Sequence, residues 1–210
     1  MTAWQAGRAA AGADLARYRT HVLESSVADV VAASQARASE VVTVHERPAR
    51  IQVLEWRTPY ASVSDTDVDP VKGITFGFLE GRLYQMTVIY DRARTVGLTT
   101  QDLVAGVSAV YGEQAPRASR PHGATGGVAD GVVIGAWHDA KASVVLVRGP
   151  YDELQLILRS TELEPRAATA IAAALSQDAA EAPARRQDAL AAEAAEAMAE
   201  RARNKSRFRP

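Results

Sequence analysis

The chain has 210 residues, which is long enough for one domain or two small ones with a substantial hydrophobic core. Its 24 Lys and Arg residues are balanced by 25 Asp and Glu residues, so it lacks the basic excess that is typical of nucleic-acid-binding proteins. The absence of cysteine excludes disulfides, thiol nucleophiles and thiolate metal sites. We therefore expect no nucleic-acid partner, and no apolar run approaches the about 18 residues of a membrane span.

Residues 1–16 are predicted to be a flexible N-terminal segment. They lack the basic stretch followed by an apolar stretch that is typical of a signal peptide. The segment 17–23 favours a short strand. A short amphipathic helix is predicted over 26–36, because Ser25 or Ser26 can cap it and Asp29 falls in its first turn.

Two strands are predicted within 40–58, broken at Pro48, which cannot donate to a ladder. The loop that follows contains Asp65, Asp67 and Asp69 at positions one, three and five of a calcium loop. The pattern then fails, since it lacks the required Gly and the bidentate Glu. An acidic, solvated loop is the favoured interpretation.

The stretch "ITFGFLEGRLYQMTVIYD" predicts a hairpin. A three-residue loop ending at Gly81 would pair Phe76 with Tyr84 and place the two apolar sets on one face. We interpret this face as core rather than binding surface. The expected core side chains are Ile74, Phe76, Phe78, Tyr84, Met86 and Val88.

The clearest helix is predicted over 99–111, capped by Thr99 or Thr100 and ended by Gly112. A Gly- and Pro-rich loop follows, without the Lys-Ser/Thr of a phosphate-binding loop. Three more strands are expected, with turns near Asp139 and Gly149.

These elements form two α-β-β-β units, 17–98 and 99–161, in which Trp56 and Trp137 occupy matching places. Because the strands arrive in hairpins, the expected class is α+β, with antiparallel sheet and helices packed on one face. The units are followed by a long Ala-rich helix over 162–210, kinked near Pro183.

A capped helix ending in "YG", a strand with Trp and a hairpin with a Gly turn resemble the BamE/SmpA-type envelope lipoprotein domain. The tandem arrangement is similar to the beta-lactamase-inhibitor-protein-like fold. "HERPARIQVLEW", "DPVKGITFGFLEGRLYQMTVIYD" and "NKSRFRP" also resemble uncharacterised exported bacterial proteins. The resemblance implies a periplasmic or secreted, non-enzymatic envelope protein that works by protein contacts.

Catalytic, cofactor and metal sites are not indicated by any motif. The histidines His21, His45, His122 and His138 lack the spacing of a metal site, and we interpret them as surface or loop residues. The two tryptophans are interpreted as core anchors. The alternative is a pocket between the two units that binds a small ligand or substrate, lined by Trp56, Arg57, Trp137 and His138.

The end of the chain is basic and carries Arg201, Arg203, Lys205, Arg207 and Arg209. A solvated terminus is the favoured interpretation, and weak contact with an anionic membrane surface is the alternative. The leading hypothesis is a non-enzymatic protein-binding or assembly module of the bacterial envelope, with an unknown protein partner and no cofactor. The rival is a small-ligand binder or enzyme that uses the pocket near the tryptophans.

Overall fold

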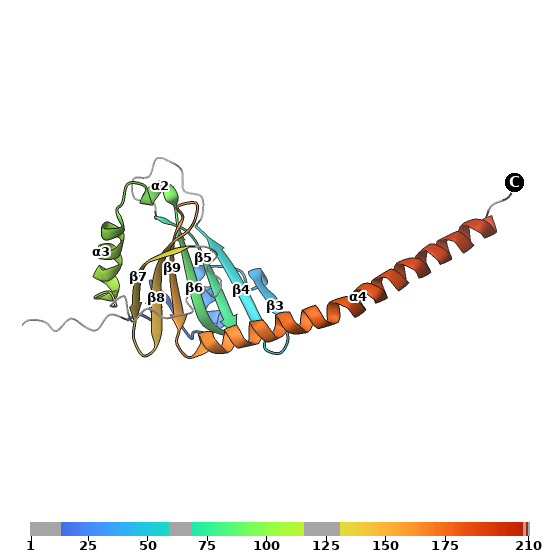
Figure 1. Cartoon of the computed structure of the whole chain (residues 1–210), viewed down its shortest axis with the longest axis horizontal. Coiled ribbons are helices and arrows are strands. Elements are labelled where there is room, and N and C mark those ends of the chain that lie inside the picture. The colour runs from blue at the N-terminus through green and yellow to red at the C-terminus, as the bar shows by residue number, and fades with distance from the viewer. Residues whose placement is uncertain (1–13, 59–68, 116–130, 208, 210) are drawn as a thin grey trace, which may run out of the picture.

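A seven-stranded antiparallel sheet organises the molecule, and β1 and β2 form a separate two-stranded sheet (Figure 1). The computed structural model describes residues 14–58, 69–115, 131–207 and 209. Within these residues seven strands pair in the order β3-β4-β5-β6-β9-β8-β7. Their bounds are β3 Val41–His45, β4 Ile51–Arg57, β5 Val71–Leu79, β6 Arg82–Tyr90, β7 Val132–His138, β8 Ala142–Arg148 and β9 Leu154–Ser160.

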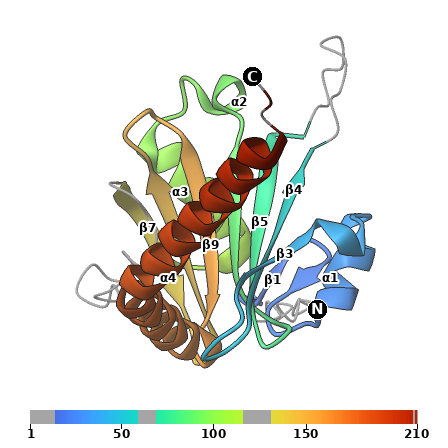
Figure 2. The same cartoon turned by 90° about the vertical axis from the view of Figure 1, so that its right-hand side faces the viewer.

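Helices cover both faces of this sheet (Figure 2). The short helices α1 (Val27–Ser34) and α3 (Thr100–Tyr111) lie on one face, and the long helix α4 (Leu163–Arg207) crosses the other. The small elements are β1 Arg17–Tyr18, β2 His21–Val22, the 3-10 turn η1 Ala38–Glu40 and α2 Arg92–Thr95. The expected α+β class with antiparallel sheet is confirmed, and α4 adds a layer on the second face.

The two helices of the first layer begin where their capping residues predict. The side chain of Ser26 accepts from the Asp29 N–H, and that of Thr99 accepts from the Asp102 N–H. Gly112, with φ of 84°, ends α3 as expected. Helix α1 stops at Ser34, short of the expected 36, because Gln35 adopts a left-handed conformation with φ of 54°.

The loop of the β5–β6 hairpin differs from the predicted one. Phe78 pairs with Leu83, so the loop has two residues, Glu80 and Gly81, and both are left-handed with φ of 49° and 78°. A bulge between Gly77 and Phe78 then shifts the register by one residue, so Phe76 pairs with Met86 and not with Tyr84. The predicted three-residue loop is therefore wrong, although the apolar sets share a face.

Tyr84 is consequently not part of the main core. It packs against Ile51 and Leu79 on the face that α4 covers. Its ring lies against Gly77, where an added Cβ would come within 3.0 Å of the ring atoms. Leu83 takes a core place instead, with none of its surface exposed. The hairpin therefore contributes to both faces, because the bulge turns Tyr84 outward.

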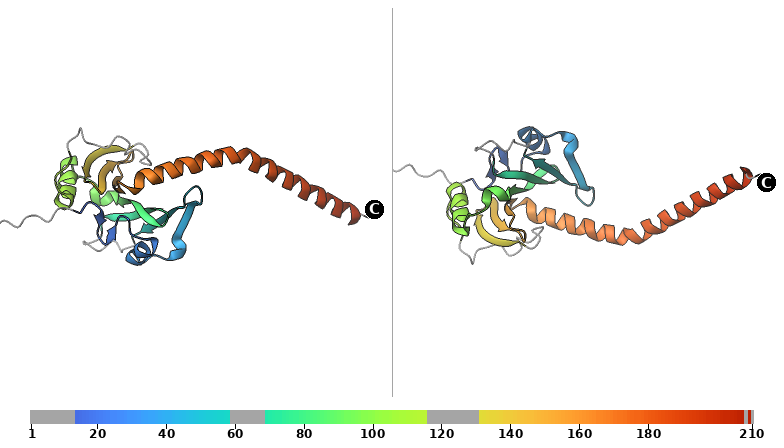
Figure 3. Two further views of the ribbon diagram at one scale, coloured as in Figure 1. Left: turned by 90° about the horizontal axis from the view of Figure 1, so that it is seen from below. Right: turned by 90° about the horizontal axis from the view of Figure 1, so that it is seen from above.

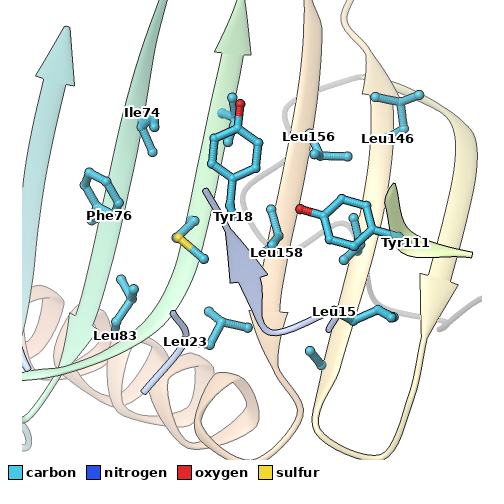
Figure 4. Close-up of a cluster of buried hydrophobic side chains, with 14 of the residues drawn as sticks. Leu15, Tyr18, Leu23, Ile74, Phe76, Leu83, Tyr111, Leu146, Leu156 and Leu158 are labelled. Atoms are coloured by element: carbon cyan, nitrogen blue, oxygen red, sulfur yellow. The ribbon is translucent and has the colours of Figure 1, made fainter. Parts of the chain in front are cut away.

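The main core lies between the sheet and the first layer (Figure 4). The chain before α1 also contributes to it, and Figure 4 shows Tyr18 and Tyr111 over the strands of both units. The Trp137 indole N–H donates to the Gly112 carbonyl at 3.0 Å, so this tryptophan is an anchored core residue. Other members of the core are Leu15, Leu23, Ile74, Phe76, Phe78, Met86, Val88, Leu146, Leu156 and Leu158.

The first turns of α4 dock on the sheet through small residues. Leu163, Ala167, Ala170 and Ala174 are buried, whereas Leu175 is 58% exposed. Helix α4 is continuous through Pro183, and it bends midway along its length (Figure 3). A proline inside a helix removes one hydrogen bond and clashes with the preceding turn, so a bend there has a physical cause. No helix among the described residues is long and apolar enough to cross a membrane.

The docking of α4 is testable with one pair of substitutions. Ala167 is fully buried, so Ala167→Leu should lower the free energy of unfolding by about 1–3 kcal/mol through overpacking. The neighbouring Ala168 is exposed, and Ala168→Leu should change it by less than about 0.5 kcal/mol. Urea titration measures both. Equal effects at the two positions would contradict the docked arrangement.

Candidate functional site

A polar pocket opens at the end of α1, beside the half-buried ring of Trp56. Its walls are the β1–β2 turn, the last turn of α1 with the residues after it, and strands β4 and β5. The cavity has a volume of about 810 Å³, within the range of small-molecule sites. Its lining residues are Arg19, Thr20, His21, Ala33, Ser34, Gln35, Ala36, Glu40, Glu55, Trp56, Arg57 and Ile74.

His21 forms part of the pocket wall and packs on the core. It is 7% exposed, and its ring meets Phe76 edge-on at 4.7 Å between centroids. The Nδ1 atom is buried and has no hydrogen-bond partner among the described residues. Burial lowers the pKa of this imidazole, and the charge of Arg19 lowers it further. His21 is therefore neutral at pH 7. The interpretation of His21 as a surface or loop histidine is wrong.

Ser34 supplies a second neutral polar group. It is 8% exposed and lies in the last turn of α1. Its Oγ is buried and, like His21 Nδ1, has no partner within the described part of the chain. Buried polar side-chain atoms are normally hydrogen-bonded, and an unpaired one costs about 1–3 kcal/mol. Both atoms are covered by the surrounding protein, so His21 and Ser34 close the wall of the pocket without exposing these two atoms to it.

The charged side chains around the pocket are paired with one another. Arg19 donates to both carboxylate oxygens of Asp69, at 2.6 and 2.7 Å. The hydrogen bonds from Arg19 keep the pKa of Asp69 below its usual value, despite partial burial. Arg37 holds Glu40 in the same way, with its closest nitrogen 2.7 Å from the carboxylate. Asp69 thus fixes the β1–β2 turn, and Asp65 and Asp67 lie outside the described residues.

An apolar groove of about 780 Å³ lies beside α3. Tyr18, Tyr90 and Tyr111 line it, and burial raises the pKa of each phenol. The Tyr111 hydroxyl donates to the Arg17 carbonyl at 2.9 Å, which ties α3 to the β1 segment. Val110 is 65% exposed at the rim. The phenols are neutral, so the groove offers apolar surface with a few hydroxyls.

The structure separates the residues of the expected inter-unit pocket. Trp56 and Arg57 are on β4, whereas Trp137 and His138 are on β7, with four strands between them in the sheet. Trp137 is buried, and His138 and Arg57 are exposed. Of the four residues, Trp56 and Arg57 line the polar pocket. The basic residues Arg201, Arg203, Lys205, Arg207 and Arg209 are exposed at the far end of the chain.

The expectation from sequence missed the two side chains that define the polar pocket, His21 and Ser34. They come from separate segments, and nothing in the sequence near either one signals burial beside the other. In the described parts of the chain, no group of three or more His, Asp or Glu side chains lies close enough together to hold a metal ion. His122 lies outside those parts.

The fold is that of an α+β protein with an antiparallel sheet and a projecting helix. No family model, curated protein or solved structure matches this chain.

The neutral state of His21 predicts a pH dependence of stability. Because the pKa is lowered in the folded state, the unfolded chain binds a proton first as the pH falls below about 6.5. The free energy of unfolding should therefore decrease from pH 7.5 to 5.5, and His21→Asn should reduce that decrease. Urea titrations at the two pH values measure it. The exposed control His138→Asn should keep the full decrease, and an unchanged decrease in His21→Asn would refute the assignment.

Proposed function

We propose that this protein is a non-enzymatic protein-binding or assembly module of the bacterial envelope, and that the exposed part of α4 is its partner-binding element. The observation that carries the proposal is the exposure of this helix. Beyond Ala174, every described residue of α4 is exposed except Ala182, which is half-buried. At 1.5 Å per residue, the exposed part is about 50 Å long, and its C-terminal portion projects beyond the sheet (Figure 1).

A polar helix of this length is not explained by the stability of the domain. It buries almost nothing on its own chain, and its large apolar residues Leu190 and Met198 are 65% and 73% exposed. Alanine propensity and ion pairs between neighbouring turns support such a helix in water. A helix that is polar on all sides typically bridges to another body. We therefore propose that a protein partner binds along the length of this helix.

Contacts at the base of the exposed part join the helix to the β3–β4 hairpin. Glu181 lies 3.5 Å from Arg47, and Asp178 lies 3.9 Å from the His45 ring, both on the β3–β4 hairpin side. Arg185 donates to Asp178 at 3.0 Å within the helix. Exposed pairs of this kind contribute little stability each. They connect this part of the helix to the β3–β4 edge of the sheet.

The envelope location in this proposal is supported by the resemblance of the sequence to envelope and exported bacterial proteins. The apolar groove beside α3 supports protein contact as the mode of action, since exposed apolar surface is typical of interaction sites. We propose weak contact between the exposed basic residues at the end of the chain and an anionic membrane surface as a secondary interaction.

Crosslinking tests the role of α4. The chain has no cysteine, so Leu190→Cys and Met198→Cys each introduce a single thiol for a photoactivatable crosslinker. In extracts of the native host, we expect a reproducible adduct of one size from these positions. Tyr151→Cys, on the β8–β9 turn and 82% exposed, is the control and should give none. The absence of adducts from α4, or the same adducts from all three positions, would refute the proposal.

Fractionation tests the envelope location separately. The protein, expressed from its own locus, should appear in the periplasmic or membrane fraction by immunoblot, with a cytoplasmic enzyme and a periplasmic protein as markers. Recovery with the cytoplasmic marker alone would remove the envelope from the proposal. The crosslinking result would still stand as a test of protein binding.

A further inference from the structure

We propose that the outer edge of strand β3 pairs with the same edge of a second copy of this chain, in an antiparallel arrangement about a two-fold axis. The inference does not depend on the proposed role of α4, because the backbone of β3 carries it. Its basis is the direction of the free backbone groups on this strand, the exposed apolar side chains beside them and the absence of charge between them.

The two edge strands of the seven-stranded sheet, β3 and β7, differ in how their outer sides are covered. At β7, the chain after α3 reaches the strand, and the Ala115 N–H donates to the Ala136 carbonyl at 2.9 Å. At β3, the Val41 N–H donates back to the Ala38 carbonyl in η1. Within the described residues, the N–H and C=O of Thr43 have no partner outside the β3–β4 ladder. An edge without such cover is a template for another strand.

The direction of the Thr43 backbone follows from the ladder on the other side of β4. Hydrogen bonds from the Glu80 N–H to the Arg50 carbonyl and from the Thr58 N–H to the Lys72 carbonyl mark the two ends of the β4–β5 ladder. In an antiparallel sheet, residues that bond to one neighbouring strand alternate with residues that bond to the other. The even-numbered residues of β4 therefore bond to β5, and the odd-numbered residues bond to β3.

Thr43 consequently directs its backbone away from the sheet. Val42 is opposite Val53, an odd-numbered residue of β4, so this pair exchanges hydrogen bonds across the β3–β4 ladder. Thr43 is the next residue, and its N–H and C=O both face outward. Reciprocal hydrogen bonds between Thr43 and Thr43 of the second copy satisfy all four groups about one two-fold axis, which is the commonest symmetry of protein dimers.

The side chains of β3 match this arrangement. Val42 and Val44 are 60% and 52% exposed, although both belong to a strand of the sheet. With the axis through Thr43, Val42 lies opposite Val44 of the second copy, and the same contact occurs again across the axis. The segment from Val41 to Val44 carries no charge, so the symmetry brings no like charges together. The edge is therefore complementary to itself.

Helix α4 lies next to this edge and enlarges the contact. Val42 shares a face of the sheet with Ile51, because its partner Val53 is two residues from Ile51 along β4, and Ile51 packs against α4. The helix continues past β3 and beyond the edge of the sheet (Figure 1). A pair of 5-residue strands buries less than the about 800 Å² per partner that is typical of a stable complex. Contact with the first exposed turns of α4 adds to it, and we expect a weak dimer.

Sedimentation velocity of the purified full chain measures the association. Between about 1 and about 300 µM, we expect a reversible shift from monomer to dimer, as a small interface implies. A monomer at every concentration would overturn the proposal, and the edge would then be open to a strand of a different protein. The measurement needs no host extract, so its failure is distinct from a failure of the crosslinking test of α4.

Substitutions place the association at this edge. Thr43→Pro removes both intermolecular hydrogen bonds and should weaken the dimer at least about tenfold. It should leave the urea midpoint nearly unchanged, because the lost N–H does not bond to β4. Thr43→Lys keeps the backbone and places two like charges opposite each other, so it should also weaken the dimer about tenfold. Val132→Lys, at a position 68% exposed on β7, is the control and should dimerise like the original chain. An unchanged dimer in Thr43→Pro, or an equal loss in Val132→Lys, would overturn the proposal.

Disulfide formation tests the register. The chain has no cysteine, so a single introduced thiol can form a disulfide only between two copies. In Thr43→Cys the two Cα atoms would lie about 5.5 Å apart on the axis, inside the range of about 4.4–6.8 Å for disulfides. In the matched variant Val42→Cys they would be diagonal neighbours about 7–8 Å apart, outside that range. Mild oxidation should therefore give a dimer on a non-reducing gel for Thr43→Cys and much less for Val42→Cys. Equal yields, or more dimer from Val42→Cys, would overturn the proposed pairing.

Discussion

The ladder between β6 and β9 is the constraint on which the rest of the structure depends. It joins the last strands of the two units over five residue pairs, from Gln85 with Arg159 to Ile89 with Gln155. Met86 and Val88 face Leu158 and Leu156 across it, and all four belong to the main core. Two small units thereby share one hydrophobic core, which is larger than either would bury alone.

The same ladder determines where α4 docks. Helix α4 follows β9 directly and contacts β6 and β9 on the face away from the core. Alanines allow close approach of the helix to the sheet, and Leu163 anchors its first turn. Ser160, fully buried at the end of β9, accepts a hydrogen bond from the Leu163 N–H at 3.2 Å and donates to Glu24 at 2.8 Å. The junction therefore connects the second unit, the helix and the chain before α1.

The polar pocket illustrates how a site arises from packing between short elements. Arg19, His21 and Ser34 belong to three different pieces of local structure that meet over β4 and β5. The capping box at Ser26 sets where α1 begins, and Gln35 sets where it ends. The helix is 8 residues long, and the pocket opens beside its last turn, where Trp56 and Ile74 also line it.

Local signals in the sequence were sufficient for most of the elements and for the class of fold. They missed α2, and the single strand predicted over 17–23 is instead the β1–β2 hairpin. The caps at Ser26 and Thr99, the stop at Gly112 and the hairpin pattern each depend on neighbouring residues, and the structure confirms them. The apolar alternation also identified the core face, except for Tyr84. That residue was misplaced because a bulge changes the register by one residue, and a register change reverses the face of a side chain.

The tertiary structure alone decided the site. The burial of His21 against Phe76 and the pairing of Arg19 with Asp69 join residues that are about 50 positions apart in the chain. No periodicity within a segment encodes such contacts. The separation of Trp56 from Trp137 has the same origin, because the repeat makes their positions equivalent while the β6–β9 ladder puts them in opposite halves of the sheet. The sequence thus determined the units, and their packing determined which side chains meet.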